Sequence, residues 1–199
     1  MVGIGDNFMP NCKESAQTAT DAVNKEIGLQ AQMMVLKNLT VIPYLGLGAM
    51  RNYAIGIACE GKADWLAILD GDVLIEDPLT FVKLIKHTKG FIVPWFDQSG
   101  LEGNHLIADP MYKADQGVQE LKWTVPYCVL YHTSIFNRIG YRPHTETMIY
   151  DEDHYNCLYL SLMGIKLWQD TNTKVKLLRG PGLLADTFKF KVLKPFENP

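Results

Sequence analysis

Residues 65–72 have the sequence WLAILDGD, in which five apolar residues are followed at once by two acids that flank a glycine. An uninterrupted apolar run of this length is typical of a β-strand that is buried on both faces of a layered α/β sheet. Asp70 and Asp72 would then lie just beyond the carboxyl end of the strand, where open α/β sheets bind their ligands. This stretch therefore predicts both the fold class and the place of a site.

Strand-like and helix-like segments alternate on both sides of this run. Apolar, strand-like segments occur at residues 2–4, 33–44, 91–95, 123–131 and 174–178. Apolar residues at helical spacing occur in residues 15–25, 48–60, 79–87, 133–138 and 151–163. Residues 97–122 are more polar and are expected to leave the layered core. We therefore predict an α/β fold with a central mixed, mostly parallel sheet flanked by helices.

The composition is that of an ordinary folded domain. The chain has 199 residues, of which 47% are hydrophobic and 21% charged, and it contains no repeat or low-complexity linker. Nineteen Lys and Arg against 22 Asp and Glu give a formal net charge of −3, so the basic excess typical of proteins that coat nucleic acid is absent. One domain over residues 1–199, with no nucleic-acid partner, is expected.

Four cysteines are spread along the chain without a Cys-x-x-Cys pair, at positions 12, 59, 128 and 157. This pattern predicts buried thiols in a reducing compartment rather than a zinc site or a disulfide framework. The first residues do not resemble a signal peptide, and no run of about 18 apolar residues occurs. A cytoplasmic protein without a transmembrane segment, at most peripheral to a membrane, is expected.

Two acidic segments are candidates for chemistry. The oxygens of Asp70 and Asp72 suit Mg²⁺ or Mn²⁺ that already holds a phosphate, although Asp-Gly is also common in plain turns. Residues 151–153, Asp-Glu-Asp, open a predicted helix, where acids stabilise the helix dipole and Asp caps the first turn without any catalytic role. Beside a bound hydroxyl, Asp151 or Asp153 could instead act as a general base.

Three motifs, taken in order, resemble those of the GT-A fold glycosyltransferases, especially the large inverting family called family 2. The motifs are Arg51-Asn52-Tyr53-Ala54, the DxD motif at residues 70–72, and Glu152-Asp153 at a helix start followed by Gly164. The resemblance covers roughly residues 48–180. In its small size the chain is similar to the compact glycosyltransferases of viruses that infect archaea or bacteria, which would place it in the host cytoplasm.

The resemblance implies a single GT-A domain with a nucleotide-sugar-binding half at residues 1–95 and an acceptor-binding half at 96–199. It implies transfer of a sugar, with inversion, from a nucleotide-diphosphate donor to a hydroxyl of a glycan, protein or lipid, with Mn²⁺ or Mg²⁺ as cofactor. Asp70 and Asp72 would hold the metal, Asp72 closer to it and Asp70 towards the ribose or sugar. Glu152-Asp153 matches the family's Glu-Asp pattern, and Asp151 lies just outside the predicted helix, where a carboxylate could also face the acceptor, so Asp151 and Asp153 are both candidates for the general base.

The resemblance also implies where the donor nucleotide binds. Gly5, Asp6, Asn7 and Arg51 correspond to the region that holds the base and phosphates. Arg179, on a Gly-Pro-Gly loop, would clamp the diphosphate or is a surface residue near a turn. The first strand lacks the family's Pro-x-x-Asn ending, which leaves the nucleotide open.

Other classes of protein share parts of this pattern. A haloacid dehalogenase-like phosphatase also has an apolar strand followed by DxD, but it carries the motif near its N-terminus and needs a Gly-Asp-x-x-x-Asp segment, which this sequence lacks. A GT-A-like nucleotidyltransferase would usually have a Gly-rich, basic phosphate loop after its first strand. A non-catalytic sugar-binding module would not need two separate acidic segments. Glycosyl transfer is therefore the preferred hypothesis.

Overall fold

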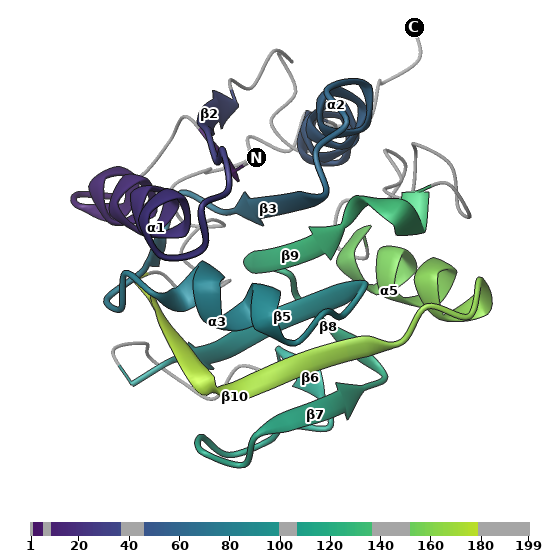
Figure 1. The fold of residues 1–199 in the computed structure, drawn as a ribbon. Helices are drawn as coiled ribbons and strands as arrows, with labels where there is room; N and C mark the ends of the chain where they lie inside the picture. The colour runs from purple at the N-terminus through teal and green to yellow at the C-terminus, as the bar shows by residue number, and fades with distance from the viewer. Residues whose placement is uncertain (1, 6–8, 37–45, 100–106, 137–151, 179–199) are drawn as a thin grey trace, which may run out of the picture.

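The structure is a computed structural model of the 199-residue chain, and it describes residues 2–5, 9–36, 46–99, 107–136 and 152–178. The main sheet has eight strands in the order β2-β1-β3-β9-β5-β10-β4, with β7 also paired to β10 (Figure 1). These strands are β1 (Val2–Gly5), β2 (Met33–Leu36), β3 (Trp65–Leu69), β4 (Val73–Leu74), β5 (Phe91–Asp97), β7 (Val118–Leu121), β9 (Cys128–His132) and β10 (Leu167–Leu177). Strands β6 (Ala108–Asp109) and β8 (Trp123–Thr124) form a second, two-stranded sheet.

The main sheet is mixed, as predicted, but it is not mostly parallel. The pairs β1–β2, β1–β3 and β5–β10 are parallel, whereas β3–β9, β5–β9, β4–β10 and β7–β10 are antiparallel. The difference arises because β9 inserts between β3 and β5 in the opposite direction. Pairing between distant segments of the chain sets these directions, and the apolar pattern of each strand does not encode them.

Helices cover both faces of the sheet. They are α1 (Cys12–Ile27), α2 (Gly46–Glu60), α3 (Thr80–Lys86) and α5 (Glu152–Leu162), with a short 3₁₀ turn η1 (Thr133–Ile135) after β9. Helices α1 and α3 pack side by side in front of the sheet in Figure 1. A hydrogen bond from Asn156 of α5 to Tyr131 of β9 places α5 on the sheet. Among the described residues, no helix is long and apolar enough to cross a membrane.

The predicted central strand is confirmed as the middle of the core. Leu66, Ala67, Ile68 and Leu69 of β3 are each no more than 2% exposed, although their side chains alternate between the two faces. Helix α1 buries Ala16, Ala19 and Val23 on one stripe, as their spacing predicts. Burial on both faces therefore explains why β3 is apolar without interruption. Cys12, Cys128 and Cys157 are buried, Cys59 is partly buried, and all four are free thiols.

The last strand is longer than its sequence suggests. Residues 174–178 were the expected strand, but β10 begins at Leu167 and pairs with β5, β7 and β4. Strand β7 consequently joins the main sheet, although residues 97–122 were expected to lie outside the layered core. Asp170 pairs with Pro94 and Lys174 with the next residue, Trp95, so residues 171–173 form a bulge that interrupts the apolar pattern.

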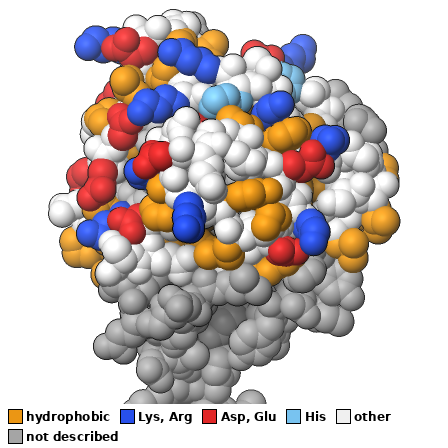
Figure 2. Space-filling model, turned by 90° about the horizontal axis from the view of Figure 1, so that it is seen from below, with side chains coloured by type: hydrophobic (Ala, Val, Ile, Leu, Met, Phe, Trp, Pro, Cys, Tyr) orange, Lys and Arg blue, Asp and Glu red, His pale blue; other side chains and the backbone are white. Residues whose placement is uncertain are grey.

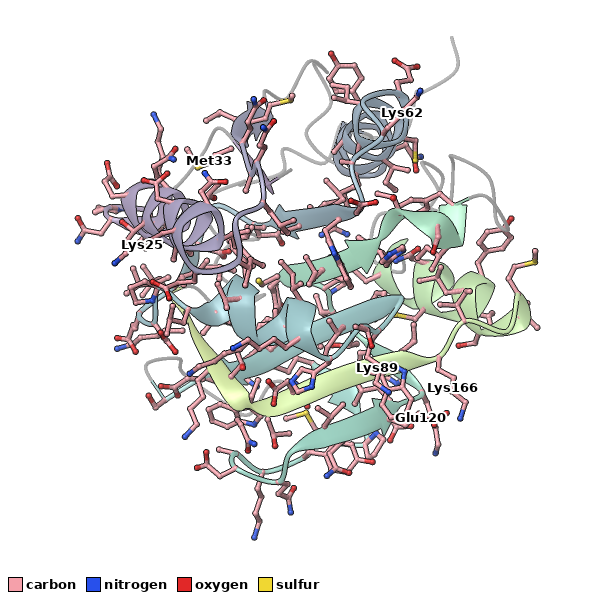
Figure 3. The ribbon with its side chains drawn as sticks, viewed as in Figure 1. Lys25, Met33, Lys62, Lys89, Glu120 and Lys166 are labelled. Carbon is pink, nitrogen blue, oxygen red and sulfur yellow. The ribbon has the colours of Figure 1, made fainter. Side chains whose placement is uncertain are left out.

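Positively and negatively charged side chains are mixed on the surface near β7 and β10. The face seen from below in Figure 2 mixes Lys and Arg with Asp and Glu around apolar side chains. Lys166 of the α5–β10 connection pairs with Glu120 of β7 at 2.8 Å, and Figure 3 shows the two side chains close together near Lys89. Lys89 and Lys166 also lie 4.1 and 5.7 Å from the centre of the Trp168 ring. The Lys166–Glu120 pair links β7 to the residue just before β10, and Lys89 links the chain before β5 to Trp168 of β10.

Candidate functional site

The Asp70-Gly71-Asp72 turn is held by segments that are distant in sequence. The Asp70 N–H donates to the Tyr127 carbonyl at 2.7 Å, and the Gly71 and Asp72 carbonyls accept from the N–H groups of Met9 and Leu178 at 2.7 and 3.0 Å. The turn therefore accepts one hydrogen bond from the chain after β1 and one from the residue after β10, and it donates one to the residue before β9. This arrangement fixes two carboxylates at the carboxyl edge of β3.

Arg51 of α2 joins this turn to the start of α5. Its Nη2 lies 3.3 Å from Oδ1 of Asp70, and its Nη1 donates to Oδ1 of Asp153 at 2.5 Å. The Arg51 side chain is only 2% exposed, whereas Asp70 and Asp153 keep 24% and 25% of their side-chain surfaces exposed. The guanidinium thus lies beneath the two carboxylates, which face outward above it.

The electrostatics of Asp70 follow from this crowding. Burial raises the pKa of Asp70 most, Arg51 opposes that effect, and the negative charges of Asp72 and Asp153 raise it further, to about 7. A carboxyl group with so high a pKa is one that the surrounding protein does not fully stabilise as an anion. A cation placed beside Asp70 would therefore relieve an unfavourable concentration of negative charge.

Helix α5 carries Asp153 and rests on a buried polar contact. Asn156, one turn further along α5, is fully buried and donates to the Tyr131 hydroxyl at 3.3 Å. Cys157 packs beside it and donates to the carbonyl of Thr124 at 3.3 Å. These contacts and the Arg51 pair fix the start of α5 against the sheet. Asp153 is therefore part of a tertiary network and is not only a residue of a helix terminus.

The donor set fits a magnesium-like ion better than a structural metal. The described residues contain no cluster of three or more His, Cys, Asp or Glu side chains able to hold an ion. Asp70 and Asp72 supply hard oxygen ligands within one turn, and Mg²⁺ commonly binds to one or two carboxylates together with phosphates of a substrate. Mn²⁺ accepts the same oxygen ligands. The residues present therefore fit a divalent ion that a phosphate ligand helps to hold.

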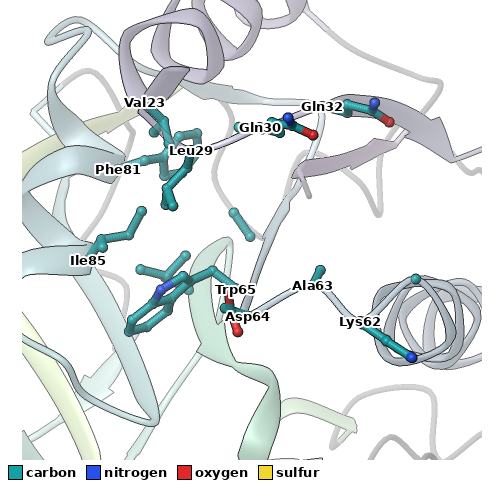
Figure 4. A pocket seen from close by; sticks show the side chains of 14 residues that line it. Val23, Leu29, Gln30, Gln32, Lys62, Ala63, Asp64, Trp65, Phe81 and Ile85 are labelled. Atoms are coloured by element: carbon teal, nitrogen blue, oxygen red, sulfur yellow. The ribbon is translucent and has the colours of Figure 1, made fainter. Parts of the chain in front are cut away.

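A cavity of about 440 Å³ lies at the other end of β3, away from the carboxylates (Figure 4). Trp65 at the beginning of β3 and Phe81 and Ile85 of α3 line its apolar part, and Gln30, Lys62 and other polar residues line the rest. Asp70 and Asp153 do not line it. The acidic site is therefore a separate feature at the opposite, carboxyl edge of β3.

The structure brings together four of the residues that the sequence predicted for a site. Asp70, Asp72 and Asp153 lie close enough for their charges to act on one another, and Arg51 contacts two of them. Arg51 was expected to contact the nucleotide, and that role stays a prediction. Its two carboxylate partners were not foreseen, because nothing in the sequence signals which residues will meet a buried arginine.

The first strand also ends at this edge. Ile4 of β1 pairs with Leu69 of β3, so Gly5 lies at the level where the Asp70 turn begins. Asp6, Asn7, Asp151 and Arg179 lie outside the described residues, and their expected roles stay predictions.

Sequence analysis did not single out Tyr127. It directly precedes β9, and its carbonyl accepts from the Asp70 N–H at 2.7 Å. Its side chain lies within the electrostatic reach of Asp70, Asp153 and Asp72. A tyrosine beside an apolar strand is an ordinary core pattern, and only the antiparallel pairing of β9 with β3 brings it to the acidic site.

No family model and no curated protein matches the sequence, whereas solved structures match the fold. The crystal structure of A197 from STIV has a TM-score of 0.55 at 14% identity, over 90% of this chain and 93% of that one. The catalytic domain of Drosophila beta1,4-galactosyltransferase 7, crystallised with xylobiose, has a TM-score of 0.57 at 14% identity, over 98% of this chain and 75% of that one.

A third structure is the mannosyltransferase PcManGT from Pyrobaculum calidifontis in complex with GDP-Man and Mn²⁺. Its TM-score is 0.54 at 11% identity, and the match covers 89% of this chain and 56% of that one. At these identities the likeness establishes the fold and not the activity. The chain has the GT-A fold of the galactosyltransferase and the mannosyltransferase, as the sequence predicted.

Proposed function

We propose that this protein is a metal-dependent glycosyltransferase that moves a sugar from a nucleotide-sugar donor to an acceptor hydroxyl, with inversion. The observation that carries the proposal is the convergence of Asp70, Asp72 and Asp153 at the carboxyl edge of β3, above the buried Arg51. Similar structures support it: PcManGT was crystallised with GDP-Man and Mn²⁺. The halves 1–95 and 96–199 would serve the donor and the acceptor.

Asp70 and Asp72 would hold a divalent cation in this proposal. When bound, that cation supplies positive charge to the diphosphate leaving group, where negative charge develops in the transition state. The high pKa of Asp70, about 7, favours such a role because a cation is a better partner for this carboxylate than the acids around it. Gly5 lies at the same edge, where the donor nucleotide would bind, and Arg179 remains a candidate clamp for the diphosphate.

Asp153 is the described candidate for the general base, and Asp151 is the other. Inversion needs a base on the acceptor side of the sugar, opposite the leaving diphosphate. Arg51 Nη1 holds Oδ1 of Asp153, which orients this carboxylate while a quarter of its surface stays accessible. The acceptor hydroxyl of a glycan, protein or lipid would lose its proton to this group as it attacks.

The test of metal dependence is the Asp72→Asn variant, which keeps the volume of the side chain and removes its charge. We expect donor turnover to fall about 10²- to 10³-fold, as when other groups that stabilise a transition state are removed. Excess EDTA should abolish the wild-type activity, and Mn²⁺ should restore it. The control is Asp115→Asn, an exposed carboxylate on a distant loop. Unchanged turnover in Asp72→Asn would contradict the proposal.

The test of the base compares Asp151→Asn with Asp153→Asn in both transfer rate and melting temperature. The base variant should lose most of its transfer rate while its affinity for the donor and Mn²⁺ stays nearly intact. A purely capping residue should instead cost about 1 kcal/mol of stability with little change in rate. The anomeric configuration of the product, read by NMR, decides between inversion and retention, and a retained configuration would refute the mechanism.

A further inference from the structure

The cavity at the beginning of β3 has an apolar interior. Four of the residues that line it are at most 4% exposed, and they are Val23 of α1, Ala67 of β3, Phe81 of α3 and Leu130 of β9. None of these four side chains carries a polar atom. A polar group that entered so far would lose its water without gaining a hydrogen-bond partner. The inner part of the cavity therefore accepts only apolar groups.

The walls of the cavity are apolar side chains that face an open space. Leu29 is 37% exposed, Trp65 and Ile85 are partly buried, and Figure 4 shows Leu29 and Trp65 on opposite sides of the cavity. The Trp65 ring meets His132 edge to face, with centroids 4.7 Å apart. Ala67 lies two residues after Trp65 on the same face of β3, and its single methyl group leaves the space between the walls unfilled.

The two connections that border the cavity are both held by hydrogen bonds. In the α1–β2 connection, the Asn24 side chain donates to the Ala31 carbonyl at 3.1 Å and accepts from the Ala31 N–H at 2.5 Å. In the α2–β3 connection, the Thr133 hydroxyl donates to the Ala63 carbonyl at 2.5 Å, and the Thr133 N–H donates to the Asp64 carbonyl at 2.9 Å. The cavity is therefore preformed, which lowers the entropy cost of binding a ligand.

The mouth of the cavity is polar. Its exposed polar residues are Gln30, Gln32, Lys62 and Asp64. They supply two neutral amides, one cation and one anion, so the mouth can hydrogen-bond a polar group without requiring one sign of charge. A volume of about 440 Å³ lies within the range of small-ligand sites, which combine mostly apolar walls with a few polar groups.

We infer that this cavity binds the alkyl or acyl chain of an amphiphile, with the polar head at the mouth. The apolar residues that line it are aliphatic except for Trp65 and Phe81. A flexible chain can follow such an irregular aliphatic surface, whereas a flat aromatic ring prefers to stack on other rings. Asp70 and Asp153 do not line the cavity, so the inference does not depend on the function proposed for the acidic site.

The experiment measures binding of cis-parinaric acid, a linear fatty acid whose fluorescence rises in an apolar site, to the delipidated protein. Binding should saturate at one molecule per chain, and 1-dodecanol should displace the probe because the chain is the part recognised. Each buried methylene contributes about fourfold in affinity, so decanoate should compete about tenfold better than octanoate. UDP or GDP with Mn²⁺ should leave the probe bound.

Two variants locate the probe. Ala67→Leu fills the interior and should weaken binding at least tenfold, with far-UV circular dichroism as the check of folding. Leu29→Gln changes an exposed wall residue and should weaken binding about fivefold. The matched control is Leu79→Gln, because Leu79 is 40% exposed and does not line the cavity. If Ala67→Leu does not fold, the comparison of Leu29→Gln with Leu79→Gln decides.

Wild-type affinity in the folded cavity variants would overturn the inference, and so would the absence of saturable binding or displacement of the probe by UDP or GDP. Phosphatidylcholine vesicles distinguish the two sources of such a chain. Co-sedimentation of the wild type but not of Ala67→Leu with vesicles would identify a membrane lipid. Saturable binding of cis-parinaric acid without co-sedimentation would identify a free amphiphile, and each of these two outcomes supports the inference.

Discussion

At the scale of single residues, Arg51 is the centre of the candidate site. A guanidinium that is 2% exposed has lost nearly all of its water, and two carboxylates replace that hydration. Arg51 in turn lowers the pKa of Asp70, against the larger effect of burial and the charges of Asp72 and Asp153. Asp70 and Asp153 lie 19 and 102 positions after Arg51 in the sequence, and this one side chain joins them.

Replacing Arg51 with Met should destabilise the protein. The change keeps much of the volume but leaves Asp70 and Asp153 facing each other without a cation, and removing one partner of a buried ion pair typically costs about 3–5 kcal/mol. Denaturant unfolding at pH 7 measures the loss. Arg51→Lys, which keeps the charge but not the two-pronged geometry, should lose less. Equal stability of wild type and both variants would show that the pair is not structural.

At the scale of elements, the bulge in β10 depends on one buried carboxylate. Asp170 is 2% exposed, and it accepts from the Thr173 hydroxyl at 2.6 Å and the Asn172 N–H at 3.0 Å. Its Oδ2 also lies 3.0 Å from Nε2 of His87, the residue that ends α3. Asp170 therefore holds the bulge together through Asn172 and Thr173, and it connects the bulge to α3 through His87.

The stability contributed by Asp170 should depend on pH. Burial alone would raise the pKa of Asp170, but the hydrogen bonds from Thr173, Asn172 and His87 outweigh burial and lower it. A lowered pKa means that the stabilisation is present above the unfolded value of about 4 and is lost as pH falls through the lower folded value. Asp170→Asn should cost about 2 kcal/mol at pH 7, and the difference from wild type should shrink below about pH 4.

Urea unfolding of both proteins at pH 7 and pH 3 measures this difference. Asp115→Asn is the control, because Asp115 pairs with Lys174 at 3.0 Å but is 69% exposed. It should change stability by less than about 1 kcal/mol at either pH. If Asp170→Asn lowered the free energy of unfolding by the same amount at pH 7 and pH 3, the charge of Asp170 would contribute nothing to stability.

At the scale of the whole molecule, the sheet order gathers the site from distant parts of the chain. Strands β1, β3 and β9 deliver Gly5, Asp70 and Tyr127 to one region, while α2 and α5 supply Arg51 and Asp153. A ligand at this place would contact several of these segments at once. Its binding should therefore stabilise the entire fold.

Thermal unfolding with Mn²⁺ and a nucleoside diphosphate tests this expectation. A ligand at 100 times its Kd adds about 2.7 kcal/mol of stability. For a chain of this size, that corresponds to a rise in Tm of roughly 5–11 °C. Asp72→Asn should remove most of the rise when Mn²⁺ and the nucleotide are present together. A rise of the same size in Asp72→Asn would place the ligand elsewhere.

The sequence by itself determined the features that depend on local pattern. Three features were predictable: the apolar run of β3, the acids that follow it and the helical stripe of α1. Burial on both faces and helical periodicity each produce a pattern that is visible within a few neighbouring residues. Those features, with the three resembling motifs, were enough to predict an α/β fold of the GT-A type and to select Asp70, Asp72 and Asp153 as candidates.

Only the tertiary structure decided which of these segments meet. The antiparallel entry of β9, the length of β10 across its bulge, the partners of Arg51 and the place of Tyr127 opposite Asp70 have no signal in the sequence. Each depends on contacts between segments tens of residues apart, and such contacts are selected by packing of the whole chain rather than by the preference of any one segment. Tyr127 was an ordinary aromatic residue in the sequence because its neighbours in space are not its neighbours along the chain.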